Sequence, residues 1–295
     1  MSVPQQREED QVALWNGAAG LTWVEAQEPL DRLFRPFEQL LVETVLTRRA
    51  RSVLDVGCGT GATTLAIARA LDDGNCVGVD ISEPMLALAK ARAQREQLAA
   101  TFVRADAQTH AFEPGSLDTI VSRFGVMFFA DPVRAFANLR SATRAGGELA
   151  LIAWRSPAEN PFMIAAERAA APFLPDLPTR NVDAPGQFAF AESGRVRGIL
   201  ERSGWAEIDV RPLDVLCRFA RDDLVGYVTR IGPIGRALRA ADEQTRTRIT
   251  EAVLPAFDQT RTRITEAVLP AFDQYVVGAE VRFVAACWMI GARSV

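Results

Sequence analysis

The sequence contains few of the residues that build metal centres or covalent intermediates. Its 295 residues include one histidine and four cysteines, and Lys90 is its single lysine. One histidine argues against a His-based metal site, and one lysine leaves little room for Schiff-base chemistry. The cysteines are far apart, and three of them lie in or beside expected strands, so we interpret all four as small apolar fillers rather than disulfide partners or ligands. They are Cys58, Cys76, Cys217 and Cys287.

Long apolar runs and an excess of positive charge are also missing. No apolar stretch approaches the ~20 residues that span a bilayer, and residues 1–10 are polar and acidic, unlike a signal peptide. The net charge of -4 argues against a general polyanion-binding surface. We therefore expect a cytoplasmic protein, monomeric or homodimeric, whose partner is a small molecule rather than a membrane or a nucleic acid.

From Ser52 onward the sequence alternates short apolar runs with longer amphipathic runs. This alternation is typical of βαβ units and predicts an α/β fold with a mostly parallel sheet. Ser82 should cap one helix, Asp131 and Pro132 should start another, and Gly146–Gly147 should end the latter. The seven expected strands are 52–56, 76–80, 101–105, 119–122, 148–154, 208–216 and 281–290.

A glycine-rich segment follows the first expected strand. Gly57, Gly59 and Gly61 remove Cβ atoms from the turn between strand and helix, so a ligand can lie against bare backbone amides. Asp80 ends the next strand, where a carboxylate can reach ribose hydroxyls in the same crevice. Together these features predict a nucleoside-containing cofactor.

The choice of cofactor depends on Asp55, inside the first expected strand. Gly57, Gly59 and Ala62 also satisfy the loose G-x-G-x-x-G/A pattern of dinucleotide-binding proteins. A carboxylate at position 55 would repel a pyrophosphate, whereas S-adenosylmethionine (SAM) carries a sulfonium and an amino-acid end and has no phosphate. The segment VLDVGCGTG at 53–61, followed by VGVDIS at 77–82, resembles motif I and the second-strand acid of class I SAM-dependent methyltransferases.

This resemblance implies a Rossmann-like seven-stranded sheet with its last strand antiparallel, helices on both faces and a helical cap. It also implies SAM as cofactor, S-adenosylhomocysteine (SAH) as product, and an adenine site beside Ile81 and Asp106. From the residues alone, Asp106 would be an ordinary turn residue. The residues expected to bind the cofactor are Asp55, Gly57, Cys58, Gly59, Gly61, Asp80, Ile81, Asp106, Ala107, Ser122 and Arg123.

Segment 121–132 follows the fourth expected strand, at the edge where open α/β sheets bind ligands. Together with DAQTH at 106–110 and FANLR at 136–140, it resembles small-molecule methyltransferases of the ubiquinone and menaquinone biosynthesis group. The resemblance implies a small apolar or aromatic acceptor, methylated at O, C or N. The residues expected near the acceptor are Trp15, Trp23, Phe124 and Met127.

Methyl transfer from a sulfonium is an in-line displacement that needs proximity and orientation rather than a protein nucleophile. His110 is the candidate general base, because no other side chain in the sequence has an unperturbed pKa near neutrality. Structural interpretations stay open for these residues. His110 can simply bond the backbone of its loop, and Trp15 and Trp23 can be core aromatic residues.

The pattern divides the chain into an N-terminal helical cap segment, 1–40, and a methyltransferase domain, 41–295, with inserted lid segments at 155–190 and 218–278. Within the second insertion, QTRTRITEAVLPAFD at 244–258 recurs without a change at 259–273. Two copies are too few for a solenoid. We interpret one copy as an extension of the lid, and deleting it should preserve SAM binding.

Two other functions share this pattern. An NAD-dependent oxidoreductase would use the same glycines and Asp80 but leaves Asp55 unexplained. A non-catalytic SAM-binding regulatory protein would keep the whole glycine-rich segment. The sequence favours a SAM-dependent methyltransferase over both.

Overall fold

The computed structural model describes residues 3–171, 184–232, 235, 266 and 268–295. These residues form two compact units. The first unit comprises 3–156, 184–215 and 285–295, and the second comprises 157–171, 216–232, 235, 266 and 268–284. Within them, no helix combines the length and the apolar character needed to cross a bilayer.

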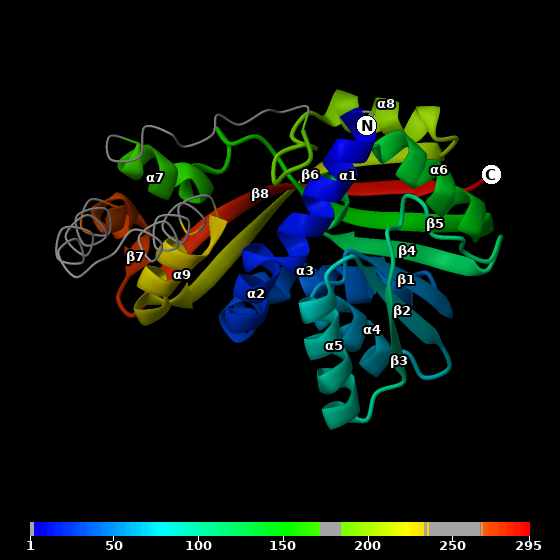
Figure 1. Cartoon of the computed structure of the whole chain (residues 1–295), viewed down its shortest axis with the longest axis horizontal. Helices are drawn as coiled ribbons and strands as arrows, with labels where there is room; N and C mark the ends of the chain where they lie inside the picture. Colours follow the sequence, from blue (N-terminus) through cyan, green and yellow to red (C-terminus); the bar gives the residue numbers. More distant parts are fainter. Residues whose placement is uncertain (1–2, 172–183, 233–234, 236–265, 267) are drawn as a thin grey trace, which may run out of the picture. The chain divides into compact units, whose positions relative to one another are not determined.

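An eight-stranded sheet, seen in Figure 1, has the strand order β3-β2-β1-β4-β5-β8-β6, with β7 paired to β8. Neighbouring strands from β3 to β5 are parallel, and β8 is antiparallel to β5. The predicted fold class is therefore confirmed, although β7 was missed. The strands are β1 Ser52–Val56, β2 Asn75–Asp80, β3 Ala100–Arg104, β4 Leu117–Arg123, β5 Thr143–Trp154, β6 Ala206–Ala220, β7 Val276–Val277 and β8 Glu280–Arg293.

Helices connect and flank these strands. The α-helices are α1 Val3–Asn16, α2 Ala18–Glu25, α3 Gln27–Thr47, α4 Ala62–Ala70, α5 Glu83–Glu96, α6 Pro132–Ala142, α7 Pro161–Ala170, α8 Ser193–Arg202 and α9 Leu224–Arg230. Short 3-10 helices lie at η1 Val126–Phe128, η2 Arg221–Asp223 and η3 Leu269–Tyr275.

The direction of the chain across the sheet reverses at β1. From β1 the chain passes through α4 to β2 and through α5 to β3, whereas after β4 it passes through α6 to β5 on the other side. Right-handed crossovers therefore place α4 and α5 on one face and α6 on the opposite face. Such a reversal opens a crevice at the carboxyl ends of β1 and β4, where open α/β sheets bind ligands.

The N-terminal helices bring an apolar stripe to this region. On α3, the side chains of Leu30, Leu33, Phe34 and Phe37 are buried, at the spacing of one helix face. This helix packs against α4, β4 and β5. The residues just beyond the stripe are thereby brought to the carboxyl ends of β1 and β4.

The predicted helix starts are confirmed by hydrogen bonds. The Ser82 hydroxyl accepts from the Met85 N–H at 3.5 Å, and Asp131 Oδ1 accepts from the Arg134 N–H at 3.0 Å. The predicted end of α6 is wrong. The helix ends at Ala142 and Gly146–Gly147 lie inside β5, because the β-branched Thr143 is already extended.

The second unit has its own aromatic core. Phe162 of α7 stacks on Phe283 of β8 with ring centroids 3.8 Å apart, and Phe272 and Tyr275 contact it edge-on. Most of the duplicated sequence, including all of 244–258, lies outside the described residues. The division into a cap segment and two inserted lids stays a prediction.

All four cysteines are free and buried, as expected of apolar fillers. Burial raises the pKa of the Cys58, Cys76 and Cys217 thiols. Each of these thiols is therefore neutral at physiological pH and is a poor nucleophile.

Candidate functional site

The glycine-rich segment connects β1 to α4 and bends sharply. Gly57 and Cys58 both donate backbone N–H groups to the Val79 carbonyl, at 2.9 and 3.1 Å, which ties the start of the turn to β2. Gly57 has φ +68°, and a Cβ there would lie 2.7 Å from the Gly125 Cα. Gly59 and Gly61 also have positive φ values, of +55° and +85°. Only glycine satisfies both the conformation and the space at position 57.

Asp80 holds this segment from the end of β2. Its Oδ2 accepts from the Gly59 N–H at 2.8 Å, and its Oδ1 accepts from the Ser82 N–H at 2.9 Å. The carboxyl group is buried, and burial raises its pKa although the amide hydrogen bonds lower it. The Ile81 backbone also lowers the pKa of Asp80 by hydrogen bonding, and the carboxylate keeps a further lone pair that can accept from a ligand hydroxyl.

Asp55 lies within β1, directly below the turn, and its side chain is fully buried. Its Oδ2 accepts from the Thr64 hydroxyl at 2.6 Å, while Oδ1 has no hydrogen-bond partner among the described residues. Burial raises the pKa of Asp55 to about 6, against the lowering effect of Thr64 and of the Arg123 guanidinium. An unpaired, fully buried acceptor of this kind is a position where a ligand donor would be stabilised.

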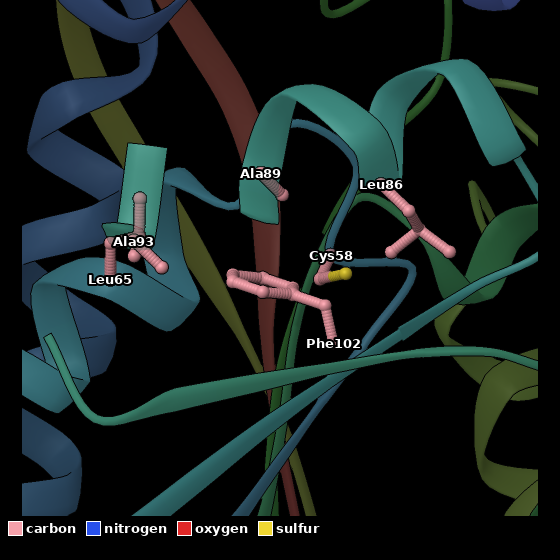
Figure 2. Packing of buried hydrophobic residues seen from close by; sticks show 6 residues of the cluster. All are labelled: Cys58, Leu65, Leu86, Ala89, Ala93 and Phe102. Atoms are coloured by element: carbon pink, nitrogen blue, oxygen red, sulfur yellow. The ribbon is translucent and has the colours of Figure 1, made fainter. Parts of the chain in front are cut away.

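Cys58 has a structural position. Figure 2 shows its side chain beside Phe102, near Leu86 and Ala89 of α5. Its side chain is part of the core that supports the turn, and Cys58 also lines the hollow described below.

The residues expected at an adenine site lie beside the ends of β2 and β3. Ile81 is half-buried, and its carbonyl accepts from the Asn16 side-chain amide at 3.0 Å. Asp106 accepts from the Gln108 N–H at 2.8 Å and from the Gln108 side-chain amide. Ala107 is buried, and its carbonyl accepts from the Asn138 side chain at 2.9 Å. Gln108 and Asn138, which the sequence interpretation left out, thus order this loop.

The residues after β4 form a second wall. Ser122 donates its hydroxyl to the Val56 carbonyl at 2.7 Å, which joins β4 to β1 at the crevice. Phe124 is buried with φ +66° and stacks on Trp154 at 4.6 Å. Positive φ is strained for a non-glycine residue, and such strain is concentrated at functional sites. Met127 is buried, and its Sδ accepts from the Trp154 N–H.

The two expected tryptophans occupy different places. Trp23 stacks on Phe34 with centroids 6.4 Å apart and lines the hollow, whereas Trp15 packs edge-on against Phe128. The Trp15 carbonyl accepts from the Ser82 hydroxyl at 2.6 Å, which anchors the end of α1 to α5.

His110 is held mainly through its backbone. Its N–H donates to the Asp106 carbonyl at 2.8 Å, and its own carbonyl accepts from the Asn138 side chain at 2.9 Å. The imidazole contacts Phe112 edge-on. His110 is not among the residues that line the hollow.

A hollow opens at the carboxyl ends of β1 and β4, where the chain direction reverses. From the expected set it brings together Gly57, Cys58 and Gly59 of the glycine-rich segment with Trp23, Arg123 and Phe124. The sequence interpretation missed the α3 side of the hollow and one loop residue, namely Gln27, Leu30, Asp31, Phe34 and Thr60. Their helical spacing shows an apolar stripe, but only the packing of α3 shows that its edge faces the glycine-rich segment.

Among the described residues that line the hollow, one carboxylate and one guanidinium carry charge, those of Asp31 and Arg123. The Arg123 guanidinium lies 5.7 Å from the Phe34 ring centroid. An anion and a cation beside bare amides suit a ligand with a zwitterionic end, and the aromatic rings beside them suit an apolar neighbour.

Comparison with known proteins shows similarity to methyltransferases. Residues 53–147 match the family described as "Methyltransferase domain". The chain is 31% identical over 121 residues to a demethylmenaquinone methyltransferase of Thermus thermophilus, covering 41% of this chain and 55% of that protein. It is 34% identical over 120 residues to a nocamycin O-methyltransferase of Saccharothrix syringae, covering 40% and 43%. The chain thus spans about half the length of the curated relatives that it matches.

Solved structures share the fold at low sequence identity. The YcgJ protein of Bacillus subtilis matches with a TM-score of 0.54 and 18% identity, over 87% of this chain and 97% of that one. A candidate methyltransferase of Bacillus halodurans matches with a TM-score of 0.51 and 15% identity, over 86% and 98%. At such identity the likeness concerns the fold alone.

Proposed function

We propose that this chain transfers the methyl group of SAM to a small apolar or aromatic acceptor at O, C or N. The match of residues 53–147 to a methyltransferase domain supports this proposal. The observation that carries the proposal is the hollow at the chain reversal, with bare loop amides on one wall and the side chains of Asp31 and Arg123 on the others. The relatives named for demethylmenaquinone and nocamycin support a small-molecule acceptor.

The residues present fit this cofactor. Asp80 would accept from a ribose hydroxyl with its remaining lone pair, while Ile81, Asp106 and Ala107 would face the adenine. Asp31 and Arg123 suit the ammonium and carboxylate of the amino-acid end, because their charges are opposite to those groups. The unpaired Oδ1 of Asp55 offers a further acceptor below the turn. Gly57, Cys58, Gly59 and Gly61 would supply close backbone contact, and Ser122 would hold the two walls together.

In the proposed reaction the protein supplies position and a dry surface. When bound, SAM supplies a methyl group whose bond to the sulfonium breaks as the bond to the acceptor forms, leaving neutral SAH. Phe124, Met127, Trp15 and Trp23 would surround the acceptor and exclude water. His110 is the proposed base for an acceptor that must lose a proton, which would otherwise pass to solvent.

Titration calorimetry tests whether SAM binds, and a substitution at Gly57 tests whether it binds against the glycine-rich segment. We expect SAM and SAH to bind the wild-type chain. Gly57→Ala should weaken SAM binding by about ten-fold or more, because the new Cβ meets the Gly125 Cα at 2.7 Å. Gly115→Ala is the matched control, since Gly115 has a similar φ of +63° but nothing lies within 4 Å of a Cβ there. Both substitutions should lose about 1 kcal/mol of stability from the positive φ, but only the first should affect SAM.

Transfer of a labelled methyl group from SAM to small molecules of a cell extract distinguishes an enzyme from a non-catalytic SAM-binding protein. Incorporation that requires the chain supports the proposal. Saturable binding of NADH without binding of SAM would overturn it in favour of an oxidoreductase.

A further inference from the structure

One guanidinium connects two segments that are distant in the sequence. Arg92 of α5 donates from Nη1 to the Thr60 carbonyl at 2.7 Å and from Nη2 to Asp31 Oδ2 at 2.7 Å. The side chains of Arg92 and Asp31 are only 11% and 20% exposed, so this ion pair is largely shielded from solvent. Shielded pairs of this geometry are much less screened than surface pairs.

Both partners of Arg92 line the hollow, whereas Arg92 itself does not. Thr60 belongs to the glycine-rich segment and Asp31 to α3, so the guanidinium joins the two walls from behind. The same Oδ2 of Asp31 also accepts from the Gln27 side-chain amide at 2.5 Å. Two donors on one carboxylate oxygen fix the orientation of Asp31 and leave its other oxygen available to a ligand.

Stabilisation of the folded state is a poor explanation for the ion pair between Arg92 and Asp31. Arg92 Nε is buried with no hydrogen-bond partner among the described residues, which is unfavourable for folding. Buried ion pairs are in general weak contributors to stability, because desolvation offsets much of the attraction. A role in holding the walls of the hollow accounts for the arrangement better.

We propose that Arg92 is a positioning residue of the cofactor site, which fixes the Asp31 carboxylate and the Thr60 carbonyl at the distance that the bound cofactor requires. The inference rests on the proposed function and adds to it a residue that contacts neither the cofactor nor the acceptor. Its effect falls on cofactor affinity, through preorganisation of the two walls.

The difference in charge between SAM and SAH distinguishes positioning by Arg92 from a simple effect of its electric field. SAM carries a net positive charge and SAH is neutral overall, because methyl loss removes the sulfonium. If Arg92 acted only through its own charge, its removal would strengthen SAM binding relative to SAH binding. If it acts by positioning, its removal weakens both ligands by the same factor.

The experiment measures the dissociation constants of SAM and SAH by calorimetry for the wild type, Arg92→Lys, Arg92→Met, Asp31→Asn and the double variant Arg92→Met/Asp31→Asn. Arg92→Met should weaken both ligands by about ten-fold. Arg92→Lys should lie between it and the wild type, because an ammonium keeps the charge but lacks the fork that reaches two acceptors. In the double variant, the loss should be smaller than the product of the two single losses, since both residues act through one contact.

Arg69→Met is the matched control, because Arg69 also pairs with α5, through Glu96, but on the exposed surface. It should bind both ligands as the wild type does. Thermal unfolding of each variant checks the fold, and Arg92→Lys keeps the test decisive if Arg92→Met is unstable.

Two results would overturn the inference. Wild-type affinity of Arg92→Met for both ligands would contradict the inference and leave the proposed function intact. A rise in the affinity of Arg92→Met for SAM relative to its affinity for SAH would do the same. A wild-type chain that binds neither ligand would contradict the proposed function, and the inference with it.

Discussion

The Asp55 carboxyl group is shielded from bulk solvent, which is unfavourable for its charged form. It is fully buried, one of its oxygens is unpaired, and burial raises its pKa to about 6. In the unfolded chain the same group has an ordinary pKa of about 3.9. The folded state therefore tolerates the charge at neutral pH at a cost that the unfolded state does not have.

The sign of this effect predicts a pH-dependent gain from Asp55→Asn. Below about pH 3 the group is protonated in both states, and above about pH 7 the wild type bears the full penalty. The unfolding free energy of Asp55→Asn should therefore rise relative to the wild type by about 2 kcal/mol between pH 4 and 7. Urea unfolding at several pH values measures the difference. We expect the same variant to bind SAM more weakly.

Asp118→Asn provides a control of opposite sign. Burial raises the pKa of Asp118, but hydrogen bonds from the backbone of Arg51 and Ser52 and from Arg144 outweigh it and lower the pKa overall. The wild type gains stability from this group as pH rises toward about 4, so the unfolding free energy of Asp118→Asn should fall relative to the wild type as pH rises to about 4 and change little between pH 4 and 7. If the difference in unfolding free energy between Asp55→Asn and the wild type did not change with pH, the raised pKa of Asp55 would be contradicted.

At the same scale, the sequence predicted the glycine-rich segment and Trp23, Arg123 and Phe124 beside it, but it missed the residues of α3 that line the same hollow. Gly57, Asp80 and Asp55 are recognisable because local spacing places them at strand ends. Asp31 and Arg92 are 61 positions apart, and nothing in the local pattern pairs them. Contacts of this kind depend on how α3 packs, which is a tertiary property.

At the scale of elements, the sequence predicted the starts of helices correctly where a capping side chain was present. The predicted first strand, 52–56, coincides with β1, and both capped helices start where predicted. The predicted strand 148–154 began late, because β5 starts at Thr143 and continues through two glycines. A glycine pair is typical of a helix end, and in this sheet the pairing of β5 with β4 overrides that local preference.

The cap of α6 gives a test at this scale. Asp131→Ala removes the acceptor of the Arg134 N–H and should lower the unfolding free energy by about 1 kcal/mol. Glu192→Ala is the control, since Glu192 precedes α8 without a side-chain cap hydrogen bond. Urea unfolding compares the two variants. Equal losses would show that the Asp131 cap contributes nothing specific.

At the scale of the whole molecule, the tandem copies make an unusual deletion possible. Removing 259–273 and removing 244–258 give the same chain, because the copies are identical. In the full chain, the second copy contains Val268 and Phe272, whose side chains are buried in the second unit. The copy that remains after the deletion contains the same two residue types at the same positions within the repeat. We therefore expect the deletion variant to fold and to bind SAM with wild-type affinity.

Calorimetry and thermal unfolding check this expectation. Deletion of both copies is the control, because it removes Val268 and Phe272 altogether and should lower the unfolding temperature. Loss of SAM binding in the single deletion would show that the length of this insertion matters to the cofactor site.

The buried cysteines allow local opening of the wild-type chain to be measured by alkylation. Cys58, Cys76 and Cys287 belong to the first unit and Cys217 to the second. An alkylating reagent reacts with a thiolate that has become exposed, so each cysteine is modified at the rate at which its surroundings open. Timed labelling followed by peptide mass analysis would therefore yield separate opening rates for the two units. Slower labelling of Cys58 on addition of a ligand would register occupancy of the glycine-rich segment without any assay of turnover.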